Sequence, residues 1–207
     1  MKTWQLHTSL TSPFGRKVRV AAGICGLSER IELVPVNVMD PDPSFRRQNP
    51  LAKVPVLVDD TGYALYDSRV ILEWLDGQAG GGVVLPAGAA RFPALRMQAL
   101  ADGIGDALLL LVYERRLRTP DMRSAVWMER QARRSDLALA TLEEALPAFD
   151  SRTPHVGDIA LACMLGLGDS HFGGKWRADH PRLVEWVEAF AERVPAFRET
   201  VVAPVPD

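Results

Sequence analysis

The chain has 207 residues, of which 47% are hydrophobic and 24% are charged, and its formal net charge is −2. This composition is ordinary for a protein with a sizeable core, and the length allows one large domain or two small ones. A net charge close to zero provides no overall positive field for a phosphate backbone, so we expect no nucleic-acid partner.

The two cysteines, Cys25 and Cys163, stand far apart in apolar surroundings. A disulfide framework or a cysteine-rich metal site is therefore not expected. His7, His171 and His180 show no ligand spacing, so we predict no metal. Apolar runs are too short for a membrane span or the core of a signal peptide, which predicts a cytoplasmic protein without a membrane partner.

The N-terminal part begins with the pattern of a strand, a helix and a second strand. Residues 3–7 alternate weakly in polarity, as a short strand does. Ser12 is a good helix N-cap before Pro13, and the apolar face of the helix that follows stops at Gly26. Residues 31–38 then have the composition of a second strand.

A hairpin and a second helix are predicted next. Residues 40–43 break the chain, residues 54–59 form a third predicted strand, and residues 60–62 turn into a fourth over 63–66. Asp67-Ser68 then begins a helix. This order predicts a thioredoxin-like layer, in which a crossover helix joins a parallel pair of strands beside an antiparallel pair.

The glycine-rich segment 77–82 is the clearest break in composition, and strand patterns end there. We therefore expect a thioredoxin-like domain over residues 1–77, a linker over 78–87 and an all-helical bundle domain over 88–207. The predicted helices of that second domain cover residues 91–117, 123–146, 159–167 and 181–194.

Two short segments in the first domain have chemistry that suits a ligand. Val54 precedes Pro55, and such a bond can be cis while the missing N–H leaves neighbouring backbone groups free to pair with a ligand. Asp67 and Ser68 place polar groups at a helix start. Taken singly, Pro55 simply begins a strand, Ser68 only caps its helix, and Lys53 is a solvated charge.

The order of these motifs resembles the cytosolic glutathione transferase family over nearly the whole chain. The resemblance rests on the Ser-Pro-x-x-Arg turn at residues 12–16, Val-Pro-Val-Leu at 54–57 and Asp-Ser at 67–68. Residues 11–14 together with 99–104 resemble the bacterial YibF-type branch of that family.

The resemblance implies a role for each residue around glutathione. The backbone of Val54, beside a cis Pro55, pairs with the cysteinyl unit, and Lys53 meets the glycyl carboxylate. The N–H and hydroxyl of Ser68 suit the γ-glutamyl carboxylate at a helix N-terminus, and Asp67 faces the γ-glutamyl amine.

The resemblance also implies a reactive centre at the start of the first helix, where N–H groups stabilise an anion. Ser12 is the best candidate for a donor to the glutathione thiolate, with Thr11 as the alternative, and the competing interpretation is that Ser12 is a plain N-cap. Phe14 is expected to contact glutathione. Redox relatives carry Cys-Pro-x-Cys at the position of residues 12–15, so dithiol exchange is not expected here.

The function implied is that of a detoxifying, homodimeric glutathione transferase. Glutathione would be the co-substrate, and a hydrophobic electrophile would be held against the helical domain, where Tyr113 and Arg116 can reach the cleft. Two alternatives stay open: a non-enzymatic glutathione-binding or protein-docking module, and a glutathione-dependent reductase or peroxidase. In the family a Ser or Thr caps the central helix three residues before an Asp. Here His155 stands before Asp158, and we expect both to be structural.

Overall fold

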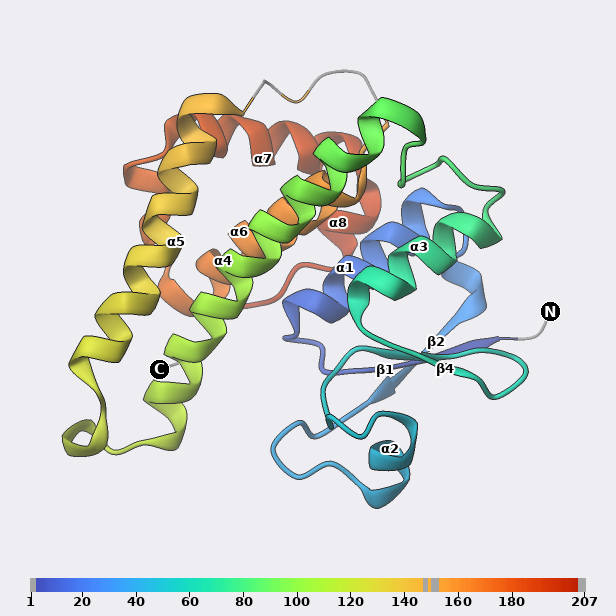
Figure 1. Cartoon of the computed structure of the whole chain (residues 1–207), viewed down its shortest axis with the longest axis horizontal. Helices are drawn as coiled ribbons and strands as arrows, with labels where there is room; N and C mark the ends of the chain where they lie inside the picture. Colours follow the sequence, from blue (N-terminus) through green and yellow to red (C-terminus); the bar gives the residue numbers. More distant parts are fainter. Residues whose placement is uncertain (1–2, 147–148, 150–152, 205–207) are drawn as a thin grey trace.

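The computed structural model describes residues 3–146, 149 and 153–204. It has a sheet-bearing half at the N-terminal side and a helical half at the C-terminal side (Figure 1). This arrangement confirms the predicted fold class. The exact domain limits at residues 77 and 88 stay a prediction.

The sheet has four strands in the order β2-β1-β3-β4. These strands are β1 (Trp4–Thr8), β2 (Ile31–Pro35), β3 (Val56–Val58) and β4 (Ala64–Leu65). β1 and β2 are parallel and are joined by helix α1 (Pro13–Ile24), whereas β3 is antiparallel to both β1 and β4. The predicted combination of a parallel and an antiparallel pair is therefore confirmed.

Alternation of side chains along β1 separates the two faces of the sheet. Trp4 and Leu6 are buried in the core with α1 and α3 (Ser68–Gln78), and the ring of Trp4 meets that of Trp74 at 4.6 Å. His7 points to the other face and approaches Phe45 of helix α2 (Pro43–Gln48). Helices therefore cover both faces, with α1 and α3 on one side and α2 on the other (Figure 1).

Helix α2 is missing from the sequence prediction, which treats residues 40–43 only as a break. Asp42 is its N-cap, since its Oδ1 accepts from the backbone N–H of Ser44 at 2.7 Å, and Pro43 takes the first helical position. Asp42 and Pro43, which interrupt the strand pattern, are thus also the residues that begin helix α2. Six residues are too few to display a helical period.

Within the described residues, the helical half contains five α-helices. They are α4 (Arg91–Leu117), α5 (Ala125–Ala145), α6 (Val156–Phe172), α7 (Pro181–Arg193) and α8 (Pro195–Glu199). Short 3-10 turns lie at Ser28–Arg30, Gly88–Ala90, Pro120–Met122 and Lys175–Ala178. The sequence does not predict the short α8, and α6 is longer at both ends than its apolar run indicates.

Helix α6 is the buried centre of the molecule and packs against both α1 and α4. A Cβ at Gly105 of α4 would meet the sulfur of Met164 of α6, so glycine is needed for this close approach. At the start of α6, Nδ1 of His155 accepts from the N–H of Asp158, and Oδ2 of Asp158 accepts from the N–H of His155. This reciprocal capping agrees with the structural role expected for both residues.

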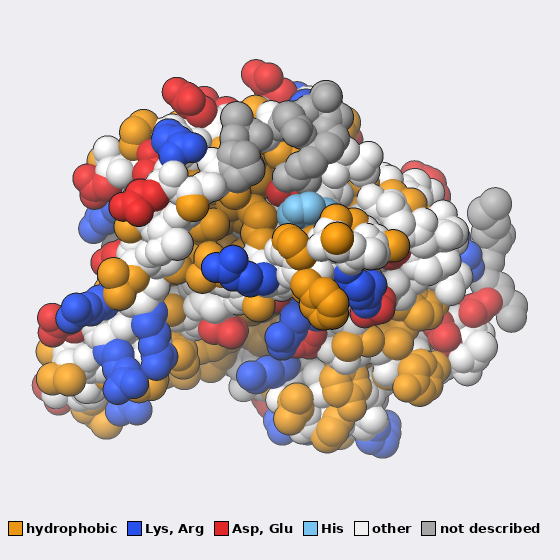
Figure 2. All heavy atoms as spheres, turned by 45° about the horizontal axis from the view of Figure 1, so that its top comes forward, with side chains coloured by type: hydrophobic (Ala, Val, Ile, Leu, Met, Phe, Trp, Pro, Cys, Tyr) orange, Lys and Arg blue, Asp and Glu red, His pale blue; other side chains and the backbone are white. Residues whose placement is uncertain are grey.

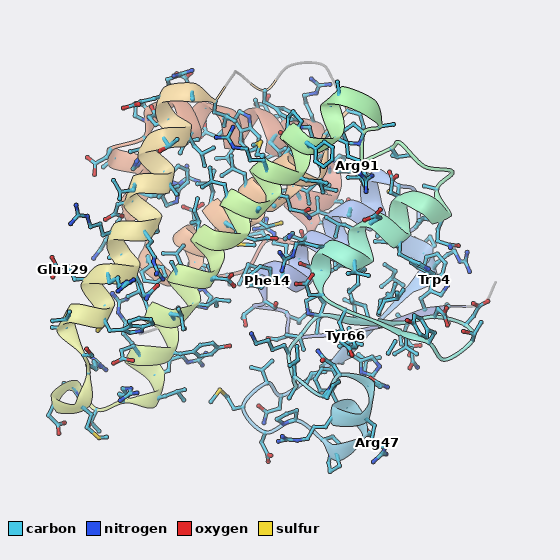
Figure 3. The ribbon with its side chains drawn as sticks, in the orientation of Figure 1. Trp4, Phe14, Arg47, Tyr66, Arg91 and Glu129 are labelled. Carbon is cyan, nitrogen blue, oxygen red and sulfur yellow. The ribbon has the colours of Figure 1, made fainter. Side chains whose placement is uncertain are left out.

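The segment between the two halves is held by one buried carboxylate. Oδ1 of Asp76, in α3, accepts from the backbone N–H groups of Val84 and Leu85 at 2.7 and 3.1 Å, and Oδ2 accepts from Gly82 at 2.8 Å. Sequence reasoning treats this segment as a linker, but the structure ties it to α3. Figure 3 shows Phe14 between α4 and the sheet-bearing half.

We predict that Asp76→Ala lowers the free energy of unfolding by about 3 kcal/mol, because backbone donors near the core lose their acceptor. Asp76→Asn keeps one acceptor oxygen and should lose less. Urea denaturation followed by circular dichroism measures both, and equal losses for the two variants would contradict the proposed anchoring by hydrogen bonds.

Candidate functional site

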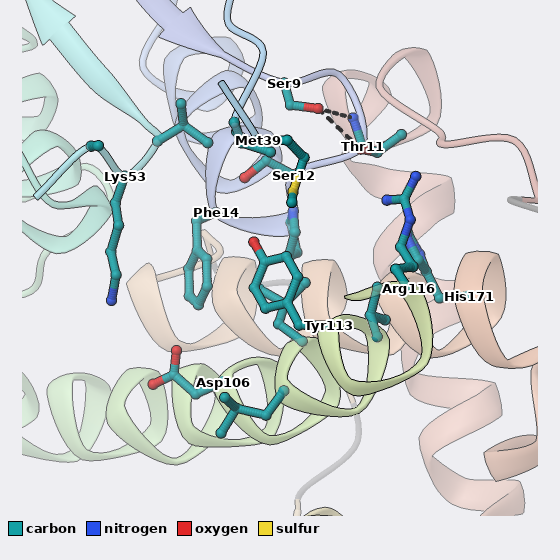
Figure 4. Close-up of a pocket in the computed structure, with 17 residues that line it drawn as sticks. Ser9, Thr11, Ser12, Phe14, Met39, Lys53, Asp106, Tyr113, Arg116 and His171 are labelled. Atoms are coloured by element: carbon teal, nitrogen blue, oxygen red, sulfur yellow. Dashed lines mark hydrogen bonds between the residues drawn. The ribbon is translucent and has the colours of Figure 1, made fainter. Parts of the chain in front are cut away.

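A cavity of about 570 Å³ lies between the loops of the sheet-bearing half and helix α4. Its walls come from residues 9, 11–14, 38–39 and 52–54 on one side. On the other side are the face of α4 between Asp106 and Arg116, and His171 of α6 (Figure 4). The volume is in the range of small-molecule sites.

The structure gathers five of the predicted site residues around this cavity. They are Thr11, Ser12, Phe14, Lys53 and Val54. The other three, Pro55, Asp67 and Ser68, are not among its lining residues. Pro55 is buried behind Val54, and the remaining two begin α3.

Ser12 is the N-cap of α1, and its Oγ accepts from the backbone N–H of Gly15 at 3.1 Å. This bond uses an oxygen lone pair and leaves the hydroxyl hydrogen free to donate. Capping and donation are therefore compatible at this residue. Thr11 is exposed, and its hydroxyl lies 3.0 Å from that of Ser9, which is a competing partner (Figure 4).

The Val54–Pro55 peptide bond is cis. Val54 comes before β3 and lies outside the registers that pair the strands, so the sheet does not use its backbone groups. The side chain of Asn49 donates to the carbonyl of Lys53 at 2.8 Å, which holds the loop beside the cavity. Lys53 itself is exposed, and Figure 4 shows its side chain at one end of the cavity.

Ser68 is held by a residue that sequence reasoning missed. Lys17 of α1 is fully buried, and its ammonium donates to Oγ of Ser68 at 3.2 Å and to Oδ1 of Asp102 at 2.5 Å. A buried ammonium needs such partners because its desolvation is costly. Since the Ser68 oxygen accepts from Lys17, the hydroxyl hydrogen is directed away from the ammonium. The only sequence signal is a lysine beside the apolar face of a helix.

Two further charges complete this cluster. Asp67 caps α3, accepting from the backbone N–H of Arg69 at 2.9 Å, and also pairs with the Arg69 guanidinium at 2.8 Å. Burial opposes ionisation of Asp67, but the hydrogen bonds from Arg69 outweigh it and lower the pKa. Nε of Arg69 lies 3.9 Å from Asp102, whose pKa is raised by burial despite the attraction of Lys17. We call Lys17, Asp67, Arg69 and Asp102 the charge cluster.

Arg16 points away from the cavity. Its guanidinium is buried, donates to the carbonyl of Phe197 at 2.8 Å and stacks on the Phe197 ring. Arg16 is therefore neither a solvated helix residue nor a positive charge beside the cavity. It fastens α1 to the C-terminal end of the helical half.

Tyr113 and Arg116 both line the cavity, together with Leu109 and Leu110 from the same helix. His171 lies near Arg116, and Nδ1 of His171 is 2.9 Å from Oγ of Ser170. Burial, with a smaller contribution from the Arg116 charge, lowers the pKa of His171. The imidazole is therefore neutral at pH 7.

Neither cysteine lines the cavity. Burial raises the pKa of both Cys25 and Cys163 to about 11, so neither is a reactive thiolate at neutral pH. Across the described ranges, no group of three or more His, Cys, Asp or Glu side chains is arranged to hold a metal ion. No helix within those ranges has both the length and the apolar character to cross a membrane.

Basic side chains gather where α4 runs into α5 (Figure 2). Several of them have partners: Arg118 pairs with Glu114 at 3.2 Å, and Arg123 donates to the backbone carbonyls of Arg115 and Arg118. A run of basic residues whose members are paired in this way is typical of a solvated helix end rather than a phosphate site.

The chain matches two protein-family descriptions. Residues 6–82 match the N-terminal domain of glutathione S-transferase, and residues 125–189 match its C-terminal domain. The chain is also 34% identical to the uncharacterized GST-like protein YibF of Escherichia coli, over 91% of this chain and 94% of that protein.

Solved structures give the same result. A glutathione transferase family member from Pseudomonas fluorescens with bound glutathione has a TM-score of 0.87 and 36% identity, covering 98% of this chain and 100% of that one. A glutathione S-transferase from Methylobacterium radiotolerans in complex with glutathione sulfonate has a TM-score of 0.88 and 33% identity, covering 100% and 98%.

We predict that Lys17→Met lowers the free energy of unfolding by about 3 kcal/mol, because it leaves the Asp102 carboxylate buried without its ammonium. The double variant Lys17→Met with Asp102→Leu should recover part of that loss. Urea denaturation of both singles and the double gives the coupling energy. Strict additivity would contradict the pairing, and the exposed Arg69→Gln is a control expected to lose less than about 1 kcal/mol.

Proposed function

The chain belongs to the glutathione S-transferase family, and on this basis we propose that it binds glutathione in the cavity and activates the thiol for conjugation to an electrophilic small molecule. The observation that carries the proposal is the Ser12 hydroxyl, which lines the cavity at the N-terminus of α1 and retains a hydrogen to donate. A thiolate there gains both a hydrogen bond and the favourable end of the helix dipole.

Glutathione would extend from the cavity towards the start of α3. In this arrangement the unpaired backbone of Val54 holds the cysteinyl unit, Lys53 meets the glycyl carboxylate and Phe14 contacts the bound peptide. The γ-glutamyl carboxylate meets the N-terminus of α3 at Ser68. The glutathione and glutathione sulfonate bound by the two solved relatives support a site of this kind.

The charge cluster supports the γ-glutamyl end of this site. The Ser68 hydroxyl oxygen accepts a hydrogen bond from the Lys17 ammonium. The hydroxyl hydrogen is then available to donate to an incoming carboxylate. The Asp67 carboxylate is ionised, and its side chain is 53% exposed, so it remains accessible to an ammonium although Arg69 already pairs with it. The chain thus presents a donor and an acceptor side by side for an amino acid end group.

The proposed reaction activates glutathione without forming a bond to the enzyme. Ser12 stabilises the thiolate while the thiol proton passes to solvent, and the sulfur then attacks an electrophilic carbon. A C–S bond forms as the leaving group departs with its electron pair, or as the π electrons of a conjugated acceptor move away. Leu109 and Leu110 supply apolar surface for the body of a hydrophobic electrophile.

Several broader features belong to the same proposal. We propose a cytoplasmic homodimer with a role in detoxification, in keeping with the family. A glutathione-dependent reductase or peroxidase is less favoured, because residues 12–15 contain no cysteine to run an exchange cycle. A non-enzymatic glutathione-binding or protein-docking module would have the same cavity and differ only in turnover.

We predict that Ser12→Ala lowers kcat/KM for conjugation about tenfold to a hundredfold, since the thiolate loses its donor. Glutathione affinity, measured by isothermal titration calorimetry, should change little. Because the substitution also removes an N-cap, Ser12→Gly is included as a variant that costs the cap only a few tenths of a kcal/mol. Thr11→Ala is the matched control, and a greater loss in Thr11→Ala than in Ser12→Ala would transfer the role to Thr11.

We also predict that millimolar glutathione raises the melting temperature, because a ligand that binds only the native state adds stability by mass action. Differential scanning fluorimetry with and without glutathione measures the shift. No shift would remove the basis of the proposed function. A shift without turnover on a panel of electrophiles would favour the non-enzymatic module.

A further inference from the structure

One face of α4 forms a continuous wall of the cavity. Asp106, Leu109, Leu110, Tyr113 and Arg116 all line it, and apart from the adjacent Leu109 and Leu110 each is three residues from the next, which places them on one face of the helix. This stripe begins with the carboxylate of Asp106, continues with two leucines, and ends with the phenol of Tyr113 and the guanidinium of Arg116. The two charged ends are ten residues apart, which is roughly 15 Å along the helix axis.

Arg116 is the free cation at one end of the stripe. It is exposed to the cavity, and it has no hydrogen bond or ion pair within the ranges that the structure describes. Its neighbours differ: the Arg115 guanidinium lies over the Phe172 ring at 5.0 Å, and Arg118 pairs with Glu114. Because the adjacent His171 is neutral at pH 7, the charge at this end is that of Arg116.

The cavity therefore holds two cations at opposite ends. Figure 4 shows Lys53 at one end, Arg116 at the other and Ser12 between them, while Asp106 lies towards the Lys53 end. In the proposed function Lys53 meets glutathione, so Arg116 is on the side of the reactive sulfur that glutathione does not occupy. Its planar guanidinium matches a carboxylate, to which it can donate two parallel hydrogen bonds.

We propose that Arg116 forms a carboxylate-binding subsite, so that the preferred electrophile carries a carboxylate on the side remote from its reacting carbon. This inference rests on the proposed function and names the substrate class of the same cavity. Leu109, Leu110 and Tyr113 hold the apolar body of the electrophile, and Ser12 faces its reacting carbon. For a benzylic chloride, sulfur forms the new C–S bond as the C–Cl bond breaks, and chloride leaves with the electron pair. The carboxylate takes no part in the bond changes.

The test compares two glutathione conjugates of equal size that differ in charge. S-(para-carboxybenzyl)glutathione carries the carboxylate, and S-(para-carbamoylbenzyl)glutathione carries a neutral amide in its place. Isothermal titration calorimetry measures both dissociation constants for the wild-type protein, for Arg116→Gln, for Arg116→Lys and for Arg115→Gln. Arg115 is the matched control, because it lies on the same helix end but does not line the cavity.

We expect the carboxylate conjugate to bind about tenfold to a hundredfold more tightly than the amide, as suits a charge-assisted pair. Arg116→Gln should abolish this preference, Arg116→Lys should retain part of it, and Arg115→Gln should retain it fully. Equal affinities in the wild type, or a preference that survives Arg116→Gln, would overturn the proposal. An equal loss for both conjugates in Arg116→Gln would assign Arg116 to glutathione itself and would also overturn it.

Turnover separates this inference from the proposed function. The wild-type protein is assayed with glutathione and para-(chloromethyl)benzoate or para-(chloromethyl)benzamide, after subtraction of the uncatalysed rates. Selective binding of the carboxylate conjugate without turnover of either chloride would refute the transferase while supporting the subsite. Turnover of both chlorides with no binding preference would support the transferase and refute the subsite.

Discussion

The fold depends on the need to satisfy one buried ammonium. Lys17 is out of contact with solvent, and the two side chains that accept hydrogen bonds from it among the described residues come from different helices: Ser68 from α3 and Asp102 from α4. An unpaired charge in such a position would be strongly destabilising, so the three helices must keep their relative positions. The sheet-bearing half and the helical half are thereby aligned at the point where the candidate site lies. Packing of α6 against α1 and α4 adds a large apolar area to this alignment.

The charged groups near the candidate site act through individual positions rather than through a strong overall field. The net charge of the chain is close to zero, yet each charged group near the site has a defined partner or position. Asp67 is paired and ionised, Arg16 is turned towards α8, and Lys53 is exposed at one end of the cavity. For the proposed glutathione ligand, charges at particular points matter more than a strong overall field.

The fold was predicted correctly where the sequence shows hydrophobic periodicity, a helix cap or a run of turn-forming residues. The succession of strands and helices in the first half, the crossover helix and the start of α1 at Ser12-Pro13 follow from alternation, capping and breaks. The sequence did not predict α2 or α8, because helices of six and five residues display no period. Lys17, Asp76 and Asp102 were missed for another reason: their partners are distant in sequence or are backbone groups, and no local pattern marks a buried charge that tertiary contacts satisfy.

Helix α4 fixes where each residue of the cavity wall lies relative to the buried Lys17–Asp102 pair. Asp102, which pairs with Lys17, lies on the same rigid helix as the stripe that ends at Arg116, so the anchored residue also sets the rotation of the cavity wall. One residue inserted between them would turn the distal part of the stripe by about 100° around the helix axis. Substitutions along the stripe would therefore change the lining of the cavity and leave its backbone in place, whereas an insertion in α4 between Asp102 and Arg116 would move the distal part of the wall.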